Sequence, residues 1–180
     1  MALLAEELVE EYFNRKGYLT IRGIKLGVQE IDIVGTRVLT SGERHNIHVE
    51  VQASIRPVSY ISKVPIAEQR NGRASNSMKR SDEEVVQGVK EWVEKKYFNQ
   101  KKVDLLTELL GGLWERILVI NNVKFENEVE LIEGHGIKIM RLSDLVSDID
   151  NKQNLVKSAS HADLVDLLEL GQSTIESGLS

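Results

Sequence analysis

The sequence predicts an α/β fold in which amphipathic helices and short strands follow one another along the chain. Two runs, residues 29–35 and 47–52, alternate β-branched and polar side chains, which is typical of half-buried strands. Residues 116–120 form an almost wholly apolar run, as expected of a buried central strand. Apolar residues recur at helical spacing before and after these strands, so helices are expected to pack on the sheet.

The first predicted helix spans residues 3–16 and ends near Gly17. Glu6 falls at the edge of the apolar stripe of this helix. Its side chain is therefore expected to reach the boundary between helix and sheet. Three other glutamates are expected on the solvent side of the helix: Glu7, Glu10 and Glu11.

Periodicity and capping patterns predict the remaining elements. Ser81 and Glu84 form a capping-box pattern, which predicts a helix from there to about residue 98. Residues 1–150 are expected to form one domain, followed at 151–180 by a polar linker, a short helix and a frayed tail. The other predicted elements are strands at 18–22 and 137–142, and helices at 103–110, 126–133 and 143–149.

Composition narrows the class of protein. The 180 residues include no cysteine, so disulfides and thiolate metal sites are excluded. No apolar run is long enough to span a membrane, and we expect a cytoplasmic protein without a membrane partner. The net charge of −5 argues against non-specific coating of nucleic acid, although it permits a local basic surface.

Acidic side chains gather on one face of two predicted strands. Because side chains alternate along a strand, Glu30 shares a face with Asp32, and His48 shares a face with Glu50 and Gln52. Acidic residues are depleted in strands, and like charges on neighbouring strands repel. No lysine or arginine lies among the polar positions of the two runs, so a divalent cation such as Mg²⁺ would offset the clustering. The alternative is an amphipathic hairpin with one wet face.

The histidines do not indicate a rival site. His45 and His48 are three residues apart on one predicted strand, so they point to opposite faces and cannot chelate one ion together. His135 lies between two glycines, in a predicted turn. We expect none of these histidines to bind a metal ion.

Residues 54–80 have a basic composition, with Glu68 as their one acid. Residues 71–77 are rich in Gly, Asn and Ser, which predicts a flexible loop. A basic loop beside an acidic site would suit contact with a phosphate backbone, although an ordinary solvated loop remains the alternative. The residues predicted to contact nucleic acid are Arg56, Lys63, Arg70, Arg73, Lys79 and Arg80.

The order helix–strand–strand–strand–helix–strand resembles the PD-(D/E)XK, or restriction endonuclease-like, nuclease superfamily. The resemblance covers roughly residues 3–145 and is most specific at Glu-Ile-Asp-Ile-Val-Gly, residues 30–35, followed by Val-Glu-Val-Gln, residues 49–52. The opening helix is similar to that of the Holliday junction resolvase-like branch. The resemblance implies an αβββαβ core with a mixed central sheet flanked by helices.

The resemblance also implies roles for individual residues. Asp32 and Glu50 would bind Mg²⁺, with Mn²⁺ as a possible substitute, and the Val51 carbonyl would be a third ligand. Glu6, or Glu7 in the alternative register, would complete the metal shell or hold a water.

One position departs from the superfamily pattern. The usual lysine, two residues after the second acid, is Gln52 here, and glutamine can orient a water but carries no positive charge. A lysine from elsewhere would supply that charge, and three are considered: Lys63, Lys79 and Lys90.

We therefore expect a Mg²⁺-dependent endodeoxyribonuclease that hydrolyses DNA phosphodiester bonds, with Asp32, Glu50, Gln52 and Glu6 in its catalytic site. Double-strand cleavage needs two such sites, which would suit a homodimer. A non-catalytic nucleic-acid-binding module on the same fold is the first alternative. A structural domain whose acids form a wet sheet face is the second.

Overall fold

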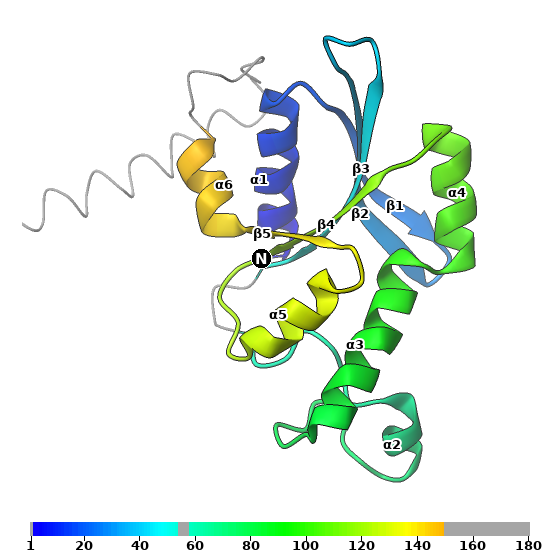
Figure 1. The fold of residues 1–180 in the computed structure, drawn as a ribbon, viewed down its shortest axis with the longest axis vertical. Coiled ribbons are helices and arrows are strands. Elements are labelled where there is room, and N and C mark those ends of the chain that lie inside the picture. The colour runs from blue at the N-terminus through cyan, green and yellow to red at the C-terminus, as the bar shows by residue number, and fades with distance from the viewer. Residues whose placement is uncertain (1, 54–57, 150–180) are drawn as a thin grey trace, which may run out of the picture.

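The computed structural model describes residues 2–53 and 58–149, and it confirms an α/β fold (Figure 1). These residues form a five-stranded mixed sheet with the order β1-β2-β3-β4-β5. The first three strands pair antiparallel, whereas β3, β4 and β5 are parallel. The strands are β1 (Leu19–Leu26), β2 (Gln29–Val38), β3 (Arg44–Gln52), β4 (Glu115–Ile120) and β5 (Lys138–Arg141).

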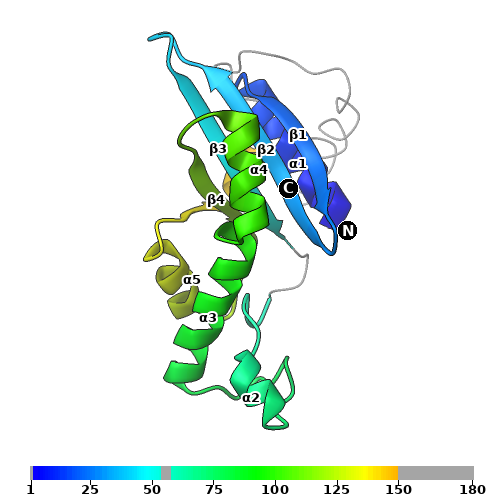
Figure 2. The same ribbon diagram turned by 90° about the vertical axis from the view of Figure 1, so that its right-hand side faces the viewer.

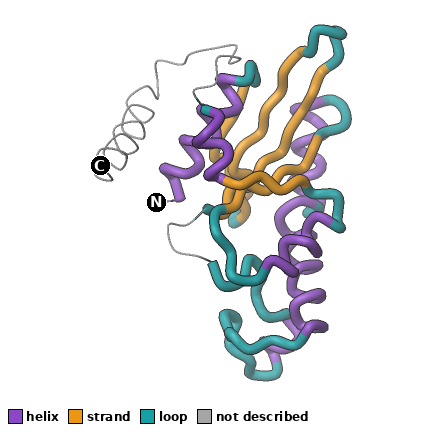
Figure 3. The backbone as a smooth tube through the Cα atoms, turned by 60° about the vertical axis from the view of Figure 1, so that its left-hand side comes forward, coloured by secondary structure: helices purple, strands orange, loops and turns teal. Residues whose placement is uncertain are grey.

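Helices cover both faces of this sheet (Figures 1 and 3). On one face, Val9 and Phe13 pack against the aliphatic side chains of β2, β3 and β4, together with Leu145. On the other, a second apolar cluster joins Leu118 and Ile120 to two further helices. The first face carries α1 (Ala2–Arg15) and α6 (Leu142–Asp148), and the second carries α3 (Asp82–Tyr97), α4 (Gln100–Leu110) and α5 (Glu126–Glu133).

The helix ends follow the expected capping chemistry. Ser81 and Glu84 form the predicted capping box, with N–H to side-chain oxygen distances of 3.3 and 2.8 Å. Helix α4 begins earlier than predicted because the Asn99 side chain accepts a hydrogen bond from the N–H of Lys101. It ends at Gly111, whose φ of +64° favours a residue without a Cβ.

The connection from β3 to α3 projects beyond the sheet as an arm, which we define as residues 58–80 (Figure 2). It contains the short helix α2 (Ile66–Arg70). The buried carboxylate of Glu128 accepts hydrogen bonds from the N–H groups of Ile61 and Ser62, at 2.6 and 2.8 Å, and from the Ser62 hydroxyl. Residues 71–77, which were predicted to form a loop, contain no helix or strand, and a buried acid on α5 fixes the base of the arm.

Some predictions fall outside the described residues. These are Arg56 and the linker, short helix and tail at 151–180. Among the residues that the structure describes, no helix is both long and apolar enough to cross a membrane.

Candidate active site

The candidate site lies where β2 and β3 stop pairing through their backbones. Their ladder runs from Val38 opposite Arg44 to Ile33 opposite Val49. Just beyond its last pair, the Asp32 carboxylate accepts a hydrogen bond from the Val51 N–H at 2.8 Å. The Asp32 side chain thus bonds to the neighbouring strand where the backbone pairing ends. The acidic residues of both strands lie at this opening.

Glu50 is buried, with a side chain that is 1% exposed, and three cationic or polar groups surround it. Lys102 Nζ lies 2.7 Å from Oε1, and Lys96 Nζ lies 2.5 Å from Oε2. His48 Nε2 is 3.1 Å from Oε1. Burial alone would raise the pKa of Glu50, but His48 and the two ammonium groups lower it to about 2. Glu50 is therefore ionised, and the ammonium groups of Lys96 and Lys102 neutralise its charge.

Asp32 has the opposite electrostatics, although it faces the same opening. Its pKa is raised to about 7, first by burial and then by the negative charge of Glu50. Lys96 and the hydrogen bond from Val51 counteract this rise only in part. Two neighbouring carboxyl groups thus have pKa values on opposite sides of their ordinary range, which is a common feature of functional sites.

The lysines around Glu50 were missed by the sequence analysis. The two strand runs themselves contain no lysine or arginine, and the cations that compensate Glu50 come from helices. Lys96 follows Val93 by three residues on the buried stripe of α3, and Lys102 precedes Leu106 by four on that of α4. A lysine on an apolar stripe was the available signal.

Glu6 lies on α1 within electrostatic reach of the site. Burial and the charge of Glu30 raise its pKa, and Lys96 and Glu50 also act on it. Glu7, the alternative register, instead pairs with Arg22 at 3.3 Å.

The expected solvent exposure of Glu11 was wrong. Its carboxylate is fully buried and lies 2.7 Å from Arg15 Nε, one helical turn further on. Arg15 in turn donates to the Ile149 carbonyl at 3.0 Å. This pair therefore ties α1 to the end of α6, away from the surface.

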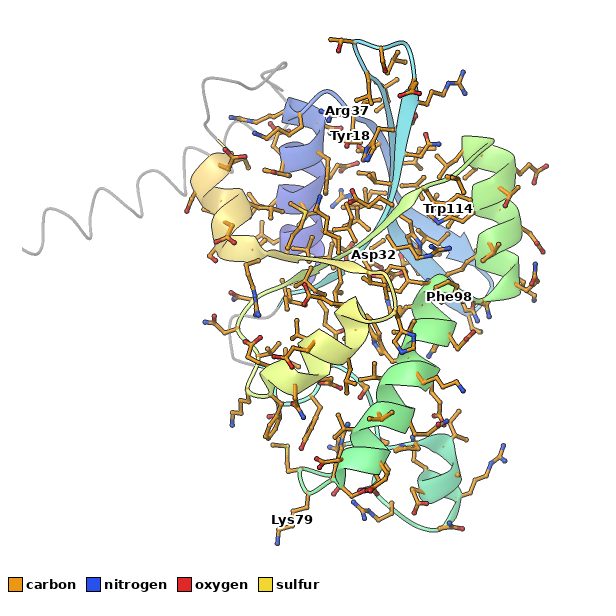
Figure 4. The ribbon with its side chains drawn as sticks, viewed as in Figure 1. Tyr18, Asp32, Arg37, Lys79, Phe98 and Trp114 are labelled. Atoms are coloured by element: carbon orange, nitrogen blue, oxygen red, sulfur yellow. The ribbon has the colours of Figure 1, made fainter. Side chains whose placement is uncertain are left out.

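Gln52 faces the same side of β3 as Glu50, and its amide lies 3.4 Å from the Ile61 carbonyl. The three lysines considered as replacements for the missing charge are all exposed. Lys79 lies near the tip of the arm, well away from Asp32 (Figure 4). Lys96 is the lysine that contacts Glu50 from α3.

The predicted nucleic-acid contacts divide into two groups. Arg73 pairs with Glu84 at 3.1 Å, and the Arg80 guanidinium lies 3.9 Å from the centre of the Tyr60 ring. These two arginines therefore stabilise the arm itself. The others that the structure describes are exposed side chains: Lys63, Arg70 and Lys79.

The fit of the site to a divalent cation depends on its oxygen donors. Among residues 2–53 and 58–149, no group of three or more His, Asp and Glu side chains could hold a metal ion. The opening does offer two carboxylates, the hard oxygen donors that Mg²⁺ prefers. Burial and the charge of Glu50 raise the pKa of Asp32 although Lys96 lowers it, so the Asp32 anion is only partly compensated. The residues therefore fit a cation, which would displace Lys96 from Glu50 Oε2.

Comparisons with known proteins add little to this geometry. No protein-family model matches the chain, and no curated protein matches it. A crystal structure of a protein of unknown function, AF1548, is similar, with a TM-score of 0.44 and 18% sequence identity. The similarity covers 78% of this chain and 59% of that protein, so the chain spans less than two thirds of its length.

Proposed function

We propose that the protein is a metal-dependent endonuclease that hydrolyses DNA phosphodiester bonds at the opening between β2 and β3. The observation that carries this proposal is the pair Asp32 and Glu50, whose pKa values are about 7 and about 2. A buried acid whose charge is only partly compensated, beside a neutralised one, is a suitable binding place for a cation and an anionic substrate together. The five-stranded mixed sheet and its element order are compatible with the restriction endonuclease-like core that the sequence resembles.

Asp32 and Glu50, with the Val51 carbonyl, would hold Mg²⁺ or Mn²⁺ in this site. When bound, such an ion polarises a phosphoryl oxygen and makes a nearby water a stronger nucleophile. Glu6 approaches from α1 and would hold a water at the edge of the same site, where burial and the charge of Glu30 raise its pKa.

Lys96 supplies the positive charge that Gln52 lacks. Its ammonium group lies 2.5 Å from Glu50 and interacts electrostatically with Asp32. With a metal ion neutralising Asp32 and Glu50, the Lys96 ammonium group would stabilise negative charge on the phosphate undergoing attack. Gln52 would orient the attacking water by hydrogen bonding. Exposed Lys63, Arg70 and Lys79 would contact flanking phosphates.

A non-catalytic nucleic-acid-binding module is the second candidate, and one observation favours it. Glu50 already has Lys96, Lys102 and His48 as partners, so its carboxylate is satisfied without a metal ion. Such a module would bind DNA in the presence of a chelator and would not cut it.

The experiment that tests the proposal is cleavage of plasmid and branched DNA with Mg²⁺ or Mn²⁺. We expect cutting by the wild type, loss of cutting in Asp32→Asn, and reduced turnover in Lys96→Met. Asp104→Asn and Lys90→Met, which alter exposed residues on α4 and α3, serve as matched controls and should cut normally.

Absence of cutting by folded wild type that still binds DNA would favour the binding module. Asp32 is the better probe than Glu50, because replacing Glu50 also removes the counter-ion of buried Lys102. For double-strand cuts we also expect a homodimer in solution.

A further inference from the structure

A groove of about 530 Å³ leads away from the Asp32–Glu50 site along α3. It begins at Val51, Gln52 and Lys96, which are also residues of the site or its immediate neighbours. Its volume falls in the usual range of small-molecule sites. The rest of its lining combines aliphatic, aromatic and charged side chains: Ile61, Val64, Ile66, Trp92, Lys63 and Lys95 among them.

The floor of this groove is apolar and aromatic. Ile61 and Val64 are 4% and 1% exposed, so they form a rigid base. Trp92 is half-buried, and its ring packs edge-on against that of Tyr97, with centroids 5.9 Å apart. A fixed tryptophan beside an open groove offers a flat surface on which a planar ring can pack.

The rim of the groove is basic. Lys63 and Lys95 are exposed there, and Lys96 joins it to the carboxylate site. Its one acid is Glu91, whose carboxylate accepts hydrogen bonds from the Ile66 N–H at 2.9 Å and the Gln87 amide at 3.1 Å. The groove therefore favours an occupant that has both an apolar planar part and negative charge.

We propose that this groove receives an unstacked nucleobase of a single DNA strand, next to the scissile phosphate at the Asp32–Glu50 site. The inference deepens the proposed nuclease function and rests on it for the cleavage step. Proteins bind single strands by combining aromatic surfaces with cationic grooves, whereas the bases of a duplex are stacked inside it. The substrate is therefore DNA with unpaired nucleotides beside the scissile bond, in preference to intact duplex.

The residues that connect the groove to the site support this assignment. The lining includes Val51 and Gln52, which follow Glu50 on β3, and Lys96, whose ammonium group contacts Glu50. A nucleotide next to a phosphate in the site would therefore reach the groove, where Trp92 is part of the lining. Lys63 and Lys95 would then face the following phosphates.

Tryptophan fluorescence tests the proposal directly. The chain has two tryptophans, so the variant Trp114→Phe leaves Trp92 as its single reporter. We would titrate this protein, with a chelator present to prevent cleavage, with a thymidine oligonucleotide, an abasic strand of equal length and a blunt duplex. Quenching by the oligonucleotide but by neither of the other two is expected. Equal quenching by the abasic strand, or none by any, would overturn the proposal.

A matched pair of variants tests the location. Ile66 in the groove and Val86 outside it are 54% and 51% exposed, so aspartate at either is tolerated and changes the net charge equally. Ile66→Asp should weaken oligonucleotide binding by about tenfold, whereas Val86→Asp should leave it nearly unchanged. Equal weakening by both would overturn the groove assignment.

The outcomes separate this inference from the proposed function. Metal-dependent cutting without quenching of Trp92 would overturn the groove alone. Quenching that depends on Ile66, without cutting under any metal, would support the groove and overturn the nuclease proposal.

Lys95→Ala, another groove variant, should also weaken binding, whereas Lys90→Ala on the same helix should not.

Discussion

The two ends of the β2–β3 pair bury polar groups in different ways. At the continuous end, the Thr36 hydroxyl donates to Asn46 at 2.7 Å, and the Asn46 amide lies 3.1 Å from the Leu113 carbonyl. At the open end, Asp32 and Glu50 are ionisable, and Glu50 needs two lysines from other elements. Neutral hydrogen bonds satisfy buried groups at low cost, whereas buried charges are expensive even when paired. Charge at the open end is therefore the costlier way to bury polar groups, which is compatible with the function proposed for it.

The open end itself contains a second contrast. Glu50 is stabilised as an anion, and its pKa falls to about 2. Asp32 is destabilised as an anion, and its pKa rises to about 7. The contributions of these acids to stability therefore differ in sign, and mutations can separate them.

The largest expected effect is that of Glu50→Gln at the open end. The variant leaves Lys102, whose side chain is 2% exposed, without its carboxylate partner. Removing one member of a buried ion pair exposes the full desolvation cost of the other, so we expect a loss of about 4 kcal/mol in the free energy of unfolding. Urea denaturation at neutral pH measures it.

Glu115→Gln is the matched control. Glu115 pairs with Lys138 at 3.3 Å, but the two side chains are 33% and 55% exposed, so solvent screens the pair. Its replacement should cost less than about 1 kcal/mol. A similarly small cost for Glu50→Gln would show that the cations around Glu50 find other partners.

The fold was largely predictable because its signals are local. The alternation at 29–35 and 47–52, the apolar run at 116–120 and the capping box at Ser81 each depend on neighbouring residues, and all gave the right element. Element ends were less predictable. Strand β1 extends to Leu26, beyond the predicted end at residue 22, and pairs there with Gln29 across a two-residue turn at Gly27, whose φ is +66°.

The site was predictable only in part, for the same reason. Period-two alternation placed Glu50 and His48 on one face, and their 3.1 Å contact confirms it. Lys96 and Lys102 reach Glu50 from 46 and 52 residues further along the chain, so their places on apolar helix stripes could mark them as unusual, but the sequence did not show their partner. The role of Glu128 at the base of the arm was likewise invisible, because its contacts with Ile61 and Ser62 span the sheet connection.

The pH dependence of stability tests the contrast between Asp32 and Glu50 at the open end. The pKa of Asp32 is about 7 in the folded state, and its ordinary value is 3.8. At a pH between these two values, Asp32 is protonated in the native state and ionised in the unfolded state. Wild-type stability should therefore fall as pH rises from about 4 through about 7. Asp32→Asn cannot lose that proton, and should be more stable than wild type by roughly 3 kcal/mol at about pH 8.

Urea denaturation across this pH range, with a chelator present, checks the sign. The difference between Asp32→Asn and wild type should become small near pH 4, about the ordinary pKa, and vanish below it, where Asp32 is protonated in both states. Mg²⁺ in place of the chelator should stabilise wild type at the higher pH and leave Asp32→Asn unaffected. The reason is that a ligand that binds only the native state raises the free energy of unfolding. A variant less stable than wild type at every pH would show that the Asp32 carboxylate is structural.

The smallest expected effect belongs to the continuous end, where Thr36→Val removes one hydroxyl. Valine keeps the branched shape that suits a strand, but the Asn46 carbonyl oxygen loses its donor at 2.7 Å. A neutral, half-exposed hydrogen bond of this kind is worth about 1 kcal/mol, so unfolding should become easier by that amount at every pH. DNA cleavage and the pH dependence assigned to Asp32 should not change, since no charge at the open end is altered. A shifted pH profile of stability in Thr36→Val would mean that the two ends of the strand pair are coupled. The distinction between a neutral continuous end and a charged open end would then be wrong.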